Sequence, residues 1–143
     1  MNIARVLATK GRNVVTIEPE QSIRRALALL CDHNIGALVV IDGGGLPIGI
    51  ISERDIVREA TRDEQIFSRA VAAIMTREVV LGVPEDELIS VSHTMTERRI
   101  RHLPVVERGR LVGIVSIGDV VKAQRDQYQG EVETLQTQLL AQG

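Results

Sequence analysis

Two serine–aspartate pairs occur at equivalent places in the chain. Ser52 and Asp55 form the first pair and Ser116 and Asp119 the second, and each follows a glycine and two aliphatic residues. A serine with a carboxylate three residues later is typical of the first turn of a helix, where each side chain satisfies a backbone N–H group. The start of a helix also binds anions, and a carboxylate accepts the hydroxyl groups of a ribose. Both interpretations stay open, because a capping group can exchange its partner for a ligand.

The two halves differ in the residues that stand just ahead of an apolar run. Arg101 and His102 precede an apolar run in the second half, where the first half has Gly36 and Ala37. A guanidinium group binds phosphate through two parallel hydrogen bonds, and an imidazole adds a donor. Solvated charges at the start of a strand are the plainer interpretation. If both halves bind a ligand, the second holds phosphate more firmly, and Arg54 compensates in part in the first.

The remaining reactive residues form no catalytic or metal-binding pattern. Cys31 is the only cysteine, and its apolar-rich surroundings predict a buried, inert thiol rather than a nucleophile. A single cysteine forms no intrachain disulfide, which is typical of a reducing compartment. His33 and His93 lack the spacing of metal ligands. We therefore predict that the protein is not an enzyme and holds no metal.

The elements that position these residues are repeated. Residues 49–57 recur at 113–121, 64 residues later, and residues 34–42 match 99–107, 65 residues later. Each copy has the pattern of a β-rich run, an amphipathic helix, two strands joined by a short loop, and a second helix. Because neither copy is long enough to bury much core alone, we expect them to pack on each other. The sequence thus predicts an α/β (α+β) fold of two β-α-β-β-α units, packed as a pseudo-two-fold pair.

The repeat divides the chain into four parts. We place the first repeat at 1–60, a charged linker at 61–70, the second repeat at 71–123 and a helical tail at 124–143. The opening β-rich runs are expected at 14–17 and 79–81, and short helices ahead of the repeats at 3–8 and 71–76.

The tail is polar apart from a narrow apolar seam. Tyr128, Val132, Leu135 and Leu139 have the spacing of a coiled coil, but Gly130 interrupts a seam of less than two heptads. An isolated helix of this length is marginal in water. The tail therefore either packs on a partner or frays.

Composition excludes several functions. The 143 residues are 44% hydrophobic and 25% charged, which is typical of soluble globular proteins. Only 1% are aromatic, too few for a platform that stacks nucleic-acid bases. The net charge of -2 offers no general attraction to nucleic acid or an anionic membrane. The chain also shows neither an apolar run of about 18 residues nor the core of a signal peptide, so we expect a cytoplasmic protein.

Together these motifs resemble the cystathionine β-synthase (CBS) domain pair. The resemblance rests on the two Gly-hydrophobic-hydrophobic-Ser-x-x-Asp motifs and on the strands that begin at Ile35 and Ile100, and it covers about residues 1–123. It is closest to small bacterial and plant proteins with a single, stand-alone pair. Such a pair implies a regulatory module that binds adenosine-containing ligands: AMP, ADP, ATP and, in some members, NAD(H) or S-adenosylmethionine.

The resemblance also assigns residues to two clefts between the repeats. In the Asp119 cleft, Ser116 and Asp119 would hold ribose and phosphate, with Arg101 and His102 on the phosphates. Adenine would lie there against aliphatic and small residues: Asn13, Val15, Ile35, Gly36 and Ala37. In the Asp55 cleft the corresponding residues are Ser52, Arg54, Asp55, Val80, Ile100, Arg101 and His102. The second repeat has Leu81-Gly82 where the first has Thr16-Ile17, so one hydroxyl group is missing there.

CBS pairs typically dimerise through their helices, so the resemblance implies a homodimer that regulates an unknown partner protein in trans. The tail would extend the dimer interface or offer a surface to that partner. The alternative is a dimeric interaction scaffold with vestigial nucleotide clefts.

Overall fold

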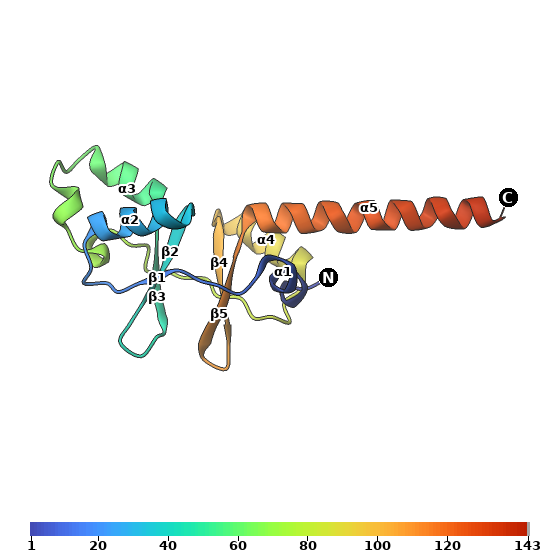
Figure 1. The fold of residues 1–143 in the computed structure, drawn as a ribbon, viewed down its shortest axis with the longest axis horizontal. Helices are drawn as coiled ribbons and strands as arrows, with labels where there is room; N and C mark the ends of the chain where they lie inside the picture. Colours follow the sequence, from blue (N-terminus) through green and yellow to red (C-terminus); the bar gives the residue numbers. More distant parts are fainter. Residues whose placement is uncertain (143) are drawn as a thin grey trace.

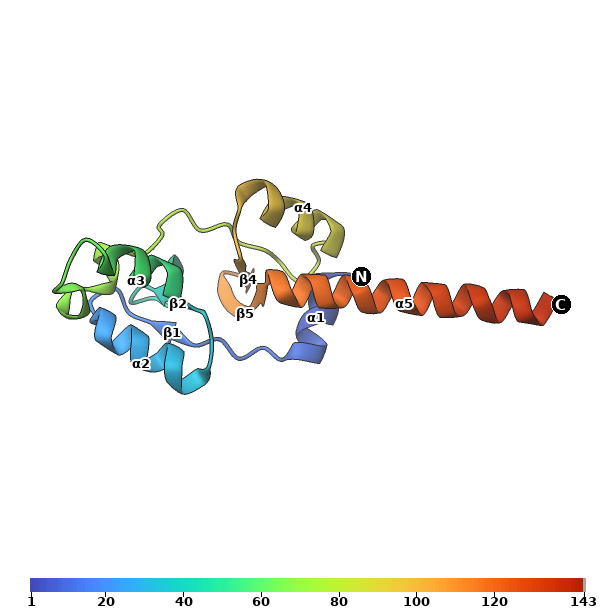
Figure 2. The ribbon, with the colours of Figure 1, turned by 90° about the horizontal axis from the view of Figure 1, so that it is seen from above.

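The computed structural model describes residues 1–142, which form two lobes with one long helix that extends from the second (Figures 1 and 2). The first lobe contains β1 (Thr16–Ile17), α2 (Ile23–His33), β2 (Ala37–Ile41), β3 (Pro47–Ser52), α3 (Glu53–Ala60) and the 3₁₀ turns η1 (Ile66–Ser68) and η2 (Val71–Ala73). The second contains α1 (Ile3–Lys10), α4 (Leu88–Arg98), β4 (His102–Glu107), β5 (Arg110–Ser116) and α5 (Ile117–Gln142).

The two lobes are built on the same hairpin and helices, as the repeat predicts. β2 pairs antiparallel with β3 and β4 with β5, so that Ser52 lies opposite Ala37 and Ser116 opposite His102. In each lobe the helix before the hairpin ends in a residue of left-handed conformation, Asn34 or Arg99, which turns the chain back toward the strand. The mixed α+β architecture of two related units is confirmed.

The opening strand of the second repeat is absent, contrary to the prediction for residues 79–81. In the first repeat the N–H group of Val39 donates to the carbonyl of Val15 at 3.4 Å, and β1 pairs parallel with β2. Pro104 occupies the place of Val39 in the second repeat and has no N–H group to donate to Val80. Only Gly82 bridges to β4, so this segment runs beside the hairpin without forming a ladder.

The short helix expected at 71–76 is also reduced, to the 3₁₀ turn Val71–Ala73. Thr76 forms a bridge with Ile50 of β3, with N–O distances of 2.8 and 3.0 Å in the two directions. Because a residue paired with a strand must be extended, the helical conformation ends before Thr76. The corresponding helix ahead of the first repeat does form, as α1.

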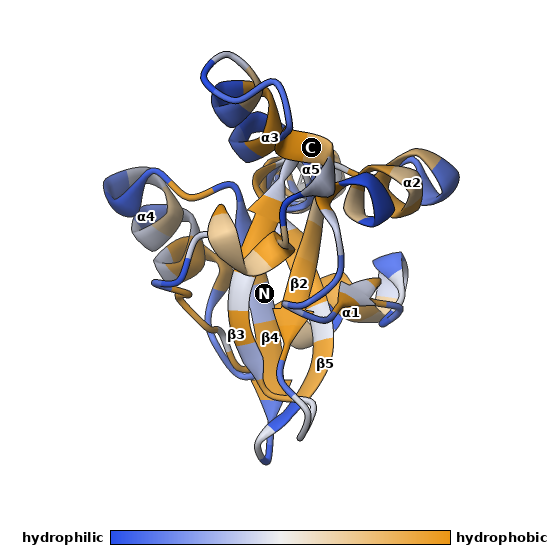
Figure 3. Ribbon diagram, turned by 90° about the vertical axis from the view of Figure 1, so that its left-hand side faces the viewer, coloured by the Kyte–Doolittle hydropathy of each residue, from blue (hydrophilic) through white to orange (hydrophobic). Residues whose placement is uncertain are grey.

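The buried side chains form two clusters rather than one shared core, and each cluster borrows a segment from the other half of the chain. Ile3 and Leu7 of α1 lie in the cluster of the second repeat, whereas Val71 and Met75 lie in that of the first. This exchange is how the two halves pack on each other. Figure 3 shows the apolar strands at the centre, with the polar faces of the helices turned outward.

The prediction that Cys31 is buried was wrong. Its side chain is exposed. α2 buries Ile23, Ala26 and Leu30, which share one face of the helix. Cys31 follows Leu30 and so points about 100° away from it around the helix, outside the buried stripe.

α5 is one continuous helix that runs through Gly130. The predicted tail begins inside this helix, and its final residue, Gly143, lies outside the described residues. Beyond the lobe the helix exposes its apolar side chains, with Tyr128 68%, Leu135 59% and Leu139 68% accessible. None of the helices within residues 1–142 combines the length and the hydrophobicity that a membrane span requires.

Candidate functional site

Both serine–aspartate pairs cap helices, as the spacing predicts. The Asp55 carboxylate accepts hydrogen bonds from the Ser52 N–H and hydroxyl groups, both at 3.0 Å, and the Asp55 N–H donates to the Ser52 Oγ at 3.2 Å. The second pair repeats this at 2.8 and 3.1 Å, from the Ser116 N–H to Asp119 and from the Asp119 N–H to the Ser116 Oγ. Each pair thus stands where a buried strand turns into a helix.

Equivalent backbone hydrogen bonds hold the two helix starts against the hairpins. The N–H of Glu53 donates to the carbonyl of Gly36 at 3.0 Å, and the N–H of Ile117 donates to that of Arg101 at 2.9 Å. In each lobe, this bond places the start of the first hairpin strand beside the first turn of a helix. That helix is the one that follows the second hairpin strand. Gly36 therefore lies beside Ser52 in the first lobe, and Arg101 lies beside Ser116 in the second, at the same end of each hairpin.

A cavity of about 450 Å³ opens beside the first pair, between the two repeats. Its volume falls in the usual range for small-molecule sites. All seven residues predicted for the Asp55 cleft line it: Ser52, Arg54, Asp55, Val80, Ile100, Arg101 and His102. The sequence analysis therefore identified a real concave surface that draws on both repeats.

The same cavity contains residues that sequence reasoning missed, namely Ile50, Glu53, Arg58, Thr76, Glu78, Val79 and Arg99. A signal was available for Arg58, which follows Arg54 by four residues and so shares its face of α3. None was available for Thr76 and Glu78, because no local spacing links these two residues to the serine–aspartate pair. Arginines outnumber carboxylates among the lining residues, which favours an anionic ligand.

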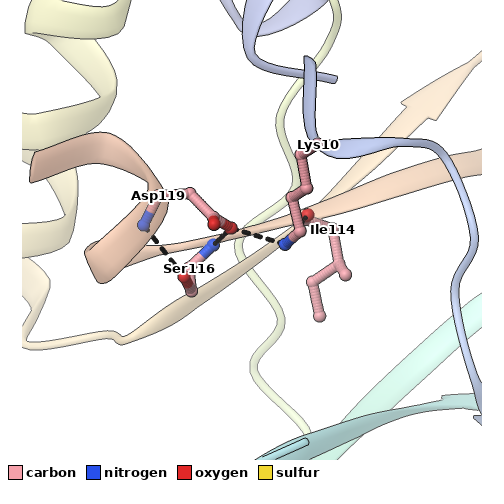
Figure 4. Close-up of polar contacts among 4 residues, drawn as sticks. All are labelled: Lys10, Ile114, Ser116 and Asp119. Atoms are coloured by element: carbon pink, nitrogen blue, oxygen red, sulfur yellow. Dashed lines mark hydrogen bonds and ion pairs between the residues drawn. The ribbon is translucent and has the colours of Figure 1, made fainter. Parts of the chain in front are cut away.

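Of the residues predicted for the Asp119 cleft, some line this cavity and others lie outside it. The cavity of about 450 Å³ contains Gly36, Arg101 and His102 from this predicted set, but none of Asn13, Val15, Ile35, Ala37, Ser116 or Asp119. Ala37 is 6% exposed, so it offers little surface to a ligand. Instead, the Lys10 ammonium donates to the Asp119 Oδ2 at 2.5 Å and to the carbonyl of Ile114 at 2.8 Å (Figure 4). Nothing in the sequence indicates this contact between residues 109 positions apart.

Two pKa values in this region are shifted. Burial lowers the pKa of His102, and the nearby Lys10 ammonium lowers it further, so both favour the neutral imidazole. For Asp119, burial opposes ionisation, but the hydrogen bonds from Lys10 and from the Ser116 N–H outweigh it and hold the pKa below its usual value. The charges that act on His102 include Asp119 and Glu53, and these two belong to the two different helix starts. His102 therefore lies between the two capped helices.

Comparison with known proteins defines the class. The family model of the CBS domain matches residues 6–62 and 71–126. The chain therefore belongs to the CBS domain family, and its two repeats form a CBS domain pair, a regulatory module.

Individual relatives agree with this assignment. CBS domain-containing protein YhcV of Bacillus subtilis is 37% identical over 112 residues, which are 78% of this chain and 79% of that protein. The crystal structure of the CBS-domain containing protein ATU1752 from Agrobacterium tumefaciens has a TM-score of 0.82 and 42% identity, and the match covers 87% of this chain and 99% of that one. The CBS domain pair of protein MJ0100, solved in complex with 5′-methylthioadenosine and S-adenosyl-L-methionine, has a TM-score of 0.79 and 26% identity, covering 89% and 98%.

Proposed function

We propose that the cavity between the repeats binds an adenosine-containing ligand and that its occupancy regulates a partner protein in trans. The observation that carries this proposal is the position of Asp55. Both Ser52 hydrogen bonds end on its Oδ2, and the hydrogen bonds within residues 1–142 include none to its Oδ1. A half-buried aspartate at the wall of a cavity suits a pair of ribose hydroxyl groups.

The other lining residues complete the proposed site. Arg54 and Arg101 bind phosphate, and the aliphatic side chains of Val80 and Ile100 provide a wall for the base. The likeness to MJ0100, a CBS pair that holds two adenosyl compounds, supports this ligand class. The candidate ligands are AMP, ADP, ATP, NAD(H) and S-adenosylmethionine.

The proposed function is regulatory rather than catalytic. A ligand in this cavity contacts both repeats, so it favours one arrangement of the two lobes over others. Such a difference in affinity between arrangements is what transmits a signal to a partner.

Calorimetric titration of the full chain with AMP, ATP, NADH and S-adenosylmethionine tests the proposal. At least one should bind, and Asp55→Ala should weaken that binding about ten- to hundred-fold, as loss of hydrogen bonds to a charged group implies. The matched control is Asp32→Ala, an exposed aspartate of α2 outside the cavity. The absence of binding by all four ligands at millimolar concentration would contradict the proposal.

A second candidate function is a dimeric interaction scaffold with vestigial clefts. It is favoured by α5, which extends from the second lobe and exposes Tyr128, Leu135 and Leu139 at coiled-coil spacing. We infer a homodimer in which this helix contributes to the interface. Ligand binding in the cavity and dimerisation through α5 are compatible, because none of the cavity residues belongs to α5.

A further inference from the structure

The apolar seam of α5 is centred on a boundary in charge. Its four residues, Tyr128, Val132, Leu135 and Leu139, are symmetric about the midpoint between residues 133 and 134. Every charged side chain of α5 lies on one side of this midpoint, within residues 119–133, and residues 134–142 carry none. The helix therefore has a charged half next to the second lobe and an uncharged half beyond it.

This symmetry fits two copies of α5 that run in opposite directions. In such a pair Tyr128 of one helix faces Leu139 of the other, and Val132 faces Leu135, so every seam residue meets an apolar residue. Tyr128 and Leu139 are each 68% exposed and Leu135 is 59% exposed, so their surfaces are free for this contact. The two ends of the seam thus complement each other.

The distribution of charge opposes the parallel alternative. Arg125 lies three residues before Tyr128 and so continues the spacing of the seam. A parallel pair in register would place the two Arg125 side chains against each other within the seam, where like charges destabilise the contact. In the antiparallel pair these two residues stand about 25 Å apart, given the rise of an α-helix. The charged half of each helix then faces the uncharged half of the other.

A hollow at the base of α5 lies next to one end of the seam. It has a volume of about 320 Å³, is formed between α4 and α5, and is lined in part by Met1, Ile89 and Tyr128. Ile89 is 74% exposed, so the hollow has an uncovered apolar wall. Because Tyr128 borders the hollow and also faces Leu139 of the second copy, the antiparallel pair brings that leucine to its edge.

We propose that two copies of the chain associate through an antiparallel pair of α5 helices, with Leu139 of each copy seated beside the hollow of the other. This inference rests on the homodimer inferred above and specifies its orientation. The second lobes of the two copies lie at opposite ends of the helix pair rather than side by side.

Crosslinking through single cysteines distinguishes the two orientations. Cys31→Ser removes the exposed native thiol, and Tyr128→Cys and Leu139→Cys are made separately in that background. A short bismaleimide should give about fivefold or more crosslinked dimer from a mixture of the two variants than from either alone, because identical positions stand about 16 Å apart in the antiparallel pair. Thr137→Cys replaces Leu139→Cys in the matched control, since residue 137 is exposed on the side of the helix opposite the seam.

Two charge substitutions give a second measurement that needs no cysteine. Glu131 and Gln138 lie on one flank of the seam, and Gln136 lies on the other. Antiparallel helices bring equal flanks together, so Gln138→Lys places an ammonium near Glu131 of the second copy and should tighten the dimer about two- to tenfold. Gln136→Lys is the matched control, because its ammonium approaches Glu131 of the second copy only in a parallel pair. Sedimentation equilibrium measures the dissociation constant of each dimer.

Three results would overturn the inference. Crosslinking of Tyr128→Cys and of Leu139→Cys each with itself, or a dimer tightened by Gln136→Lys and not by Gln138→Lys, would show a parallel pair and leave the homodimer intact. A dimer in which neither mixture crosslinks, and which neither lysine tightens, would place the interface outside this seam. A monomeric wild-type protein would contradict the homodimer as well. The calorimetric test of ligand binding is independent of all three, because none of the cavity residues belongs to α5.

Discussion

Ser52 and Ser116 each end a strand and begin a helix, so the groups available to a ligand also stabilise the free protein. The capping and ligand-binding interpretations of the motif therefore do not exclude each other. What distinguishes the two copies is the third partner of the carboxylate, which is Lys10 at Asp119. A substitution at either pair can change both the stability of the protein and its affinity for a ligand, so the two must be measured separately.

Gly36 offers such a separation. A Cβ atom added there would meet only Glu53 Oε1 at 3.8 Å and His102 Nε2 at 4.0 Å, which are ordinary contacts. Gly36→Ala should therefore melt within a few degrees of the wild type. If a flat base approaches this backbone, the added methyl group should weaken adenosine-ligand binding several-fold. Calorimetry and thermal unfolding measure the two effects, and unchanged affinity would mean that no ligand approaches Gly36.

The ionisation of Asp119 gives a prediction about pH. Because its pKa is lowered in the folded protein, the ionised form stabilises the fold above the unfolded value of about 3.9, and this contribution is lost as the pH falls through the folded value. Asp119→Asn should lower the melting temperature by about 2–5 °C at pH 7. The difference from the wild type should shrink below about pH 4.

Calorimetric melting at pH 7, 5, 4 and 3 follows this difference, with Asp32→Asn as an exposed control. A difference that stays constant from pH 7 to pH 3 would mean that the substitution at Asp119 acts through altered packing rather than through the lost charge.

At the scale of elements, glycines mark the places where α1 and the 71–76 segment cross the strands of the opposite repeat. Gly49 lies under Met75, and Gly113 lies under Leu7. These two contacts allow the exchanged segments to approach the strands closely. Gly130 has no such role, since nothing lies within 4 Å of the position its Cβ would take.

Alanine substitutions at Gly113 and Gly130 should therefore have opposite effects. Gly113→Ala forces the Leu7 side chain to move and should cost about 1–3 kcal/mol of unfolding free energy. Gly130→Ala should stabilise α5 locally by about 0.5–1 kcal/mol, because alanine is favoured in a helix interior. Urea unfolding measures the first effect, and helical circular dichroism on heating measures the second. Equal loss of stability in both variants would contradict the close approach of α1 to β5.

At the scale of the whole molecule, the exchange of segments joins the lobes and α5 extends beyond them. α1 supplies core residues and Lys10 to the second repeat, and residues 71–75 supply core residues to the first. The cavity beside Asp55 lies between the lobes, whereas the exposed apolar seam lies at a distance on α5. The proposed ligand binding and the proposed dimerisation can therefore be tested by separate mutations.

The prediction at this scale concerns α5. If the seam forms the homodimer interface, the double change Leu135→Lys with Leu139→Lys should convert a dimer into a monomer of about 15.7 kDa, and truncation after Gln127 should give a smaller monomer. Light scattering with size exclusion measures the mass. Leu140→Lys is the matched control, because Leu140 is 81% exposed but lies off the seam. Nucleotide affinity should be unchanged in all these variants, and a dimer that survives truncation would place the interface elsewhere.

Much of the fold was predictable because its signals are local. The helices, the hairpins and both caps follow from spacings within about ten residues, and the internal repeat shows that the same unit occurs twice. Seven of the residues that line the cavity beside Asp55 were also predictable, since they match the family's motifs position by position. The missing strand at 79–81 was in principle predictable as well, from Pro104 in the place of Val39.

The tertiary structure alone decided which segment packs on which repeat. The sequence places α1 ahead of the first repeat, but its buried face fits beneath the strands of the second. That choice sets Lys10 against Asp119, which no local spacing indicates. The physical reason is that periodicity reports the burial of a face but not the surface that covers it, and the covering surface is selected by shape and charge across distant parts of the chain.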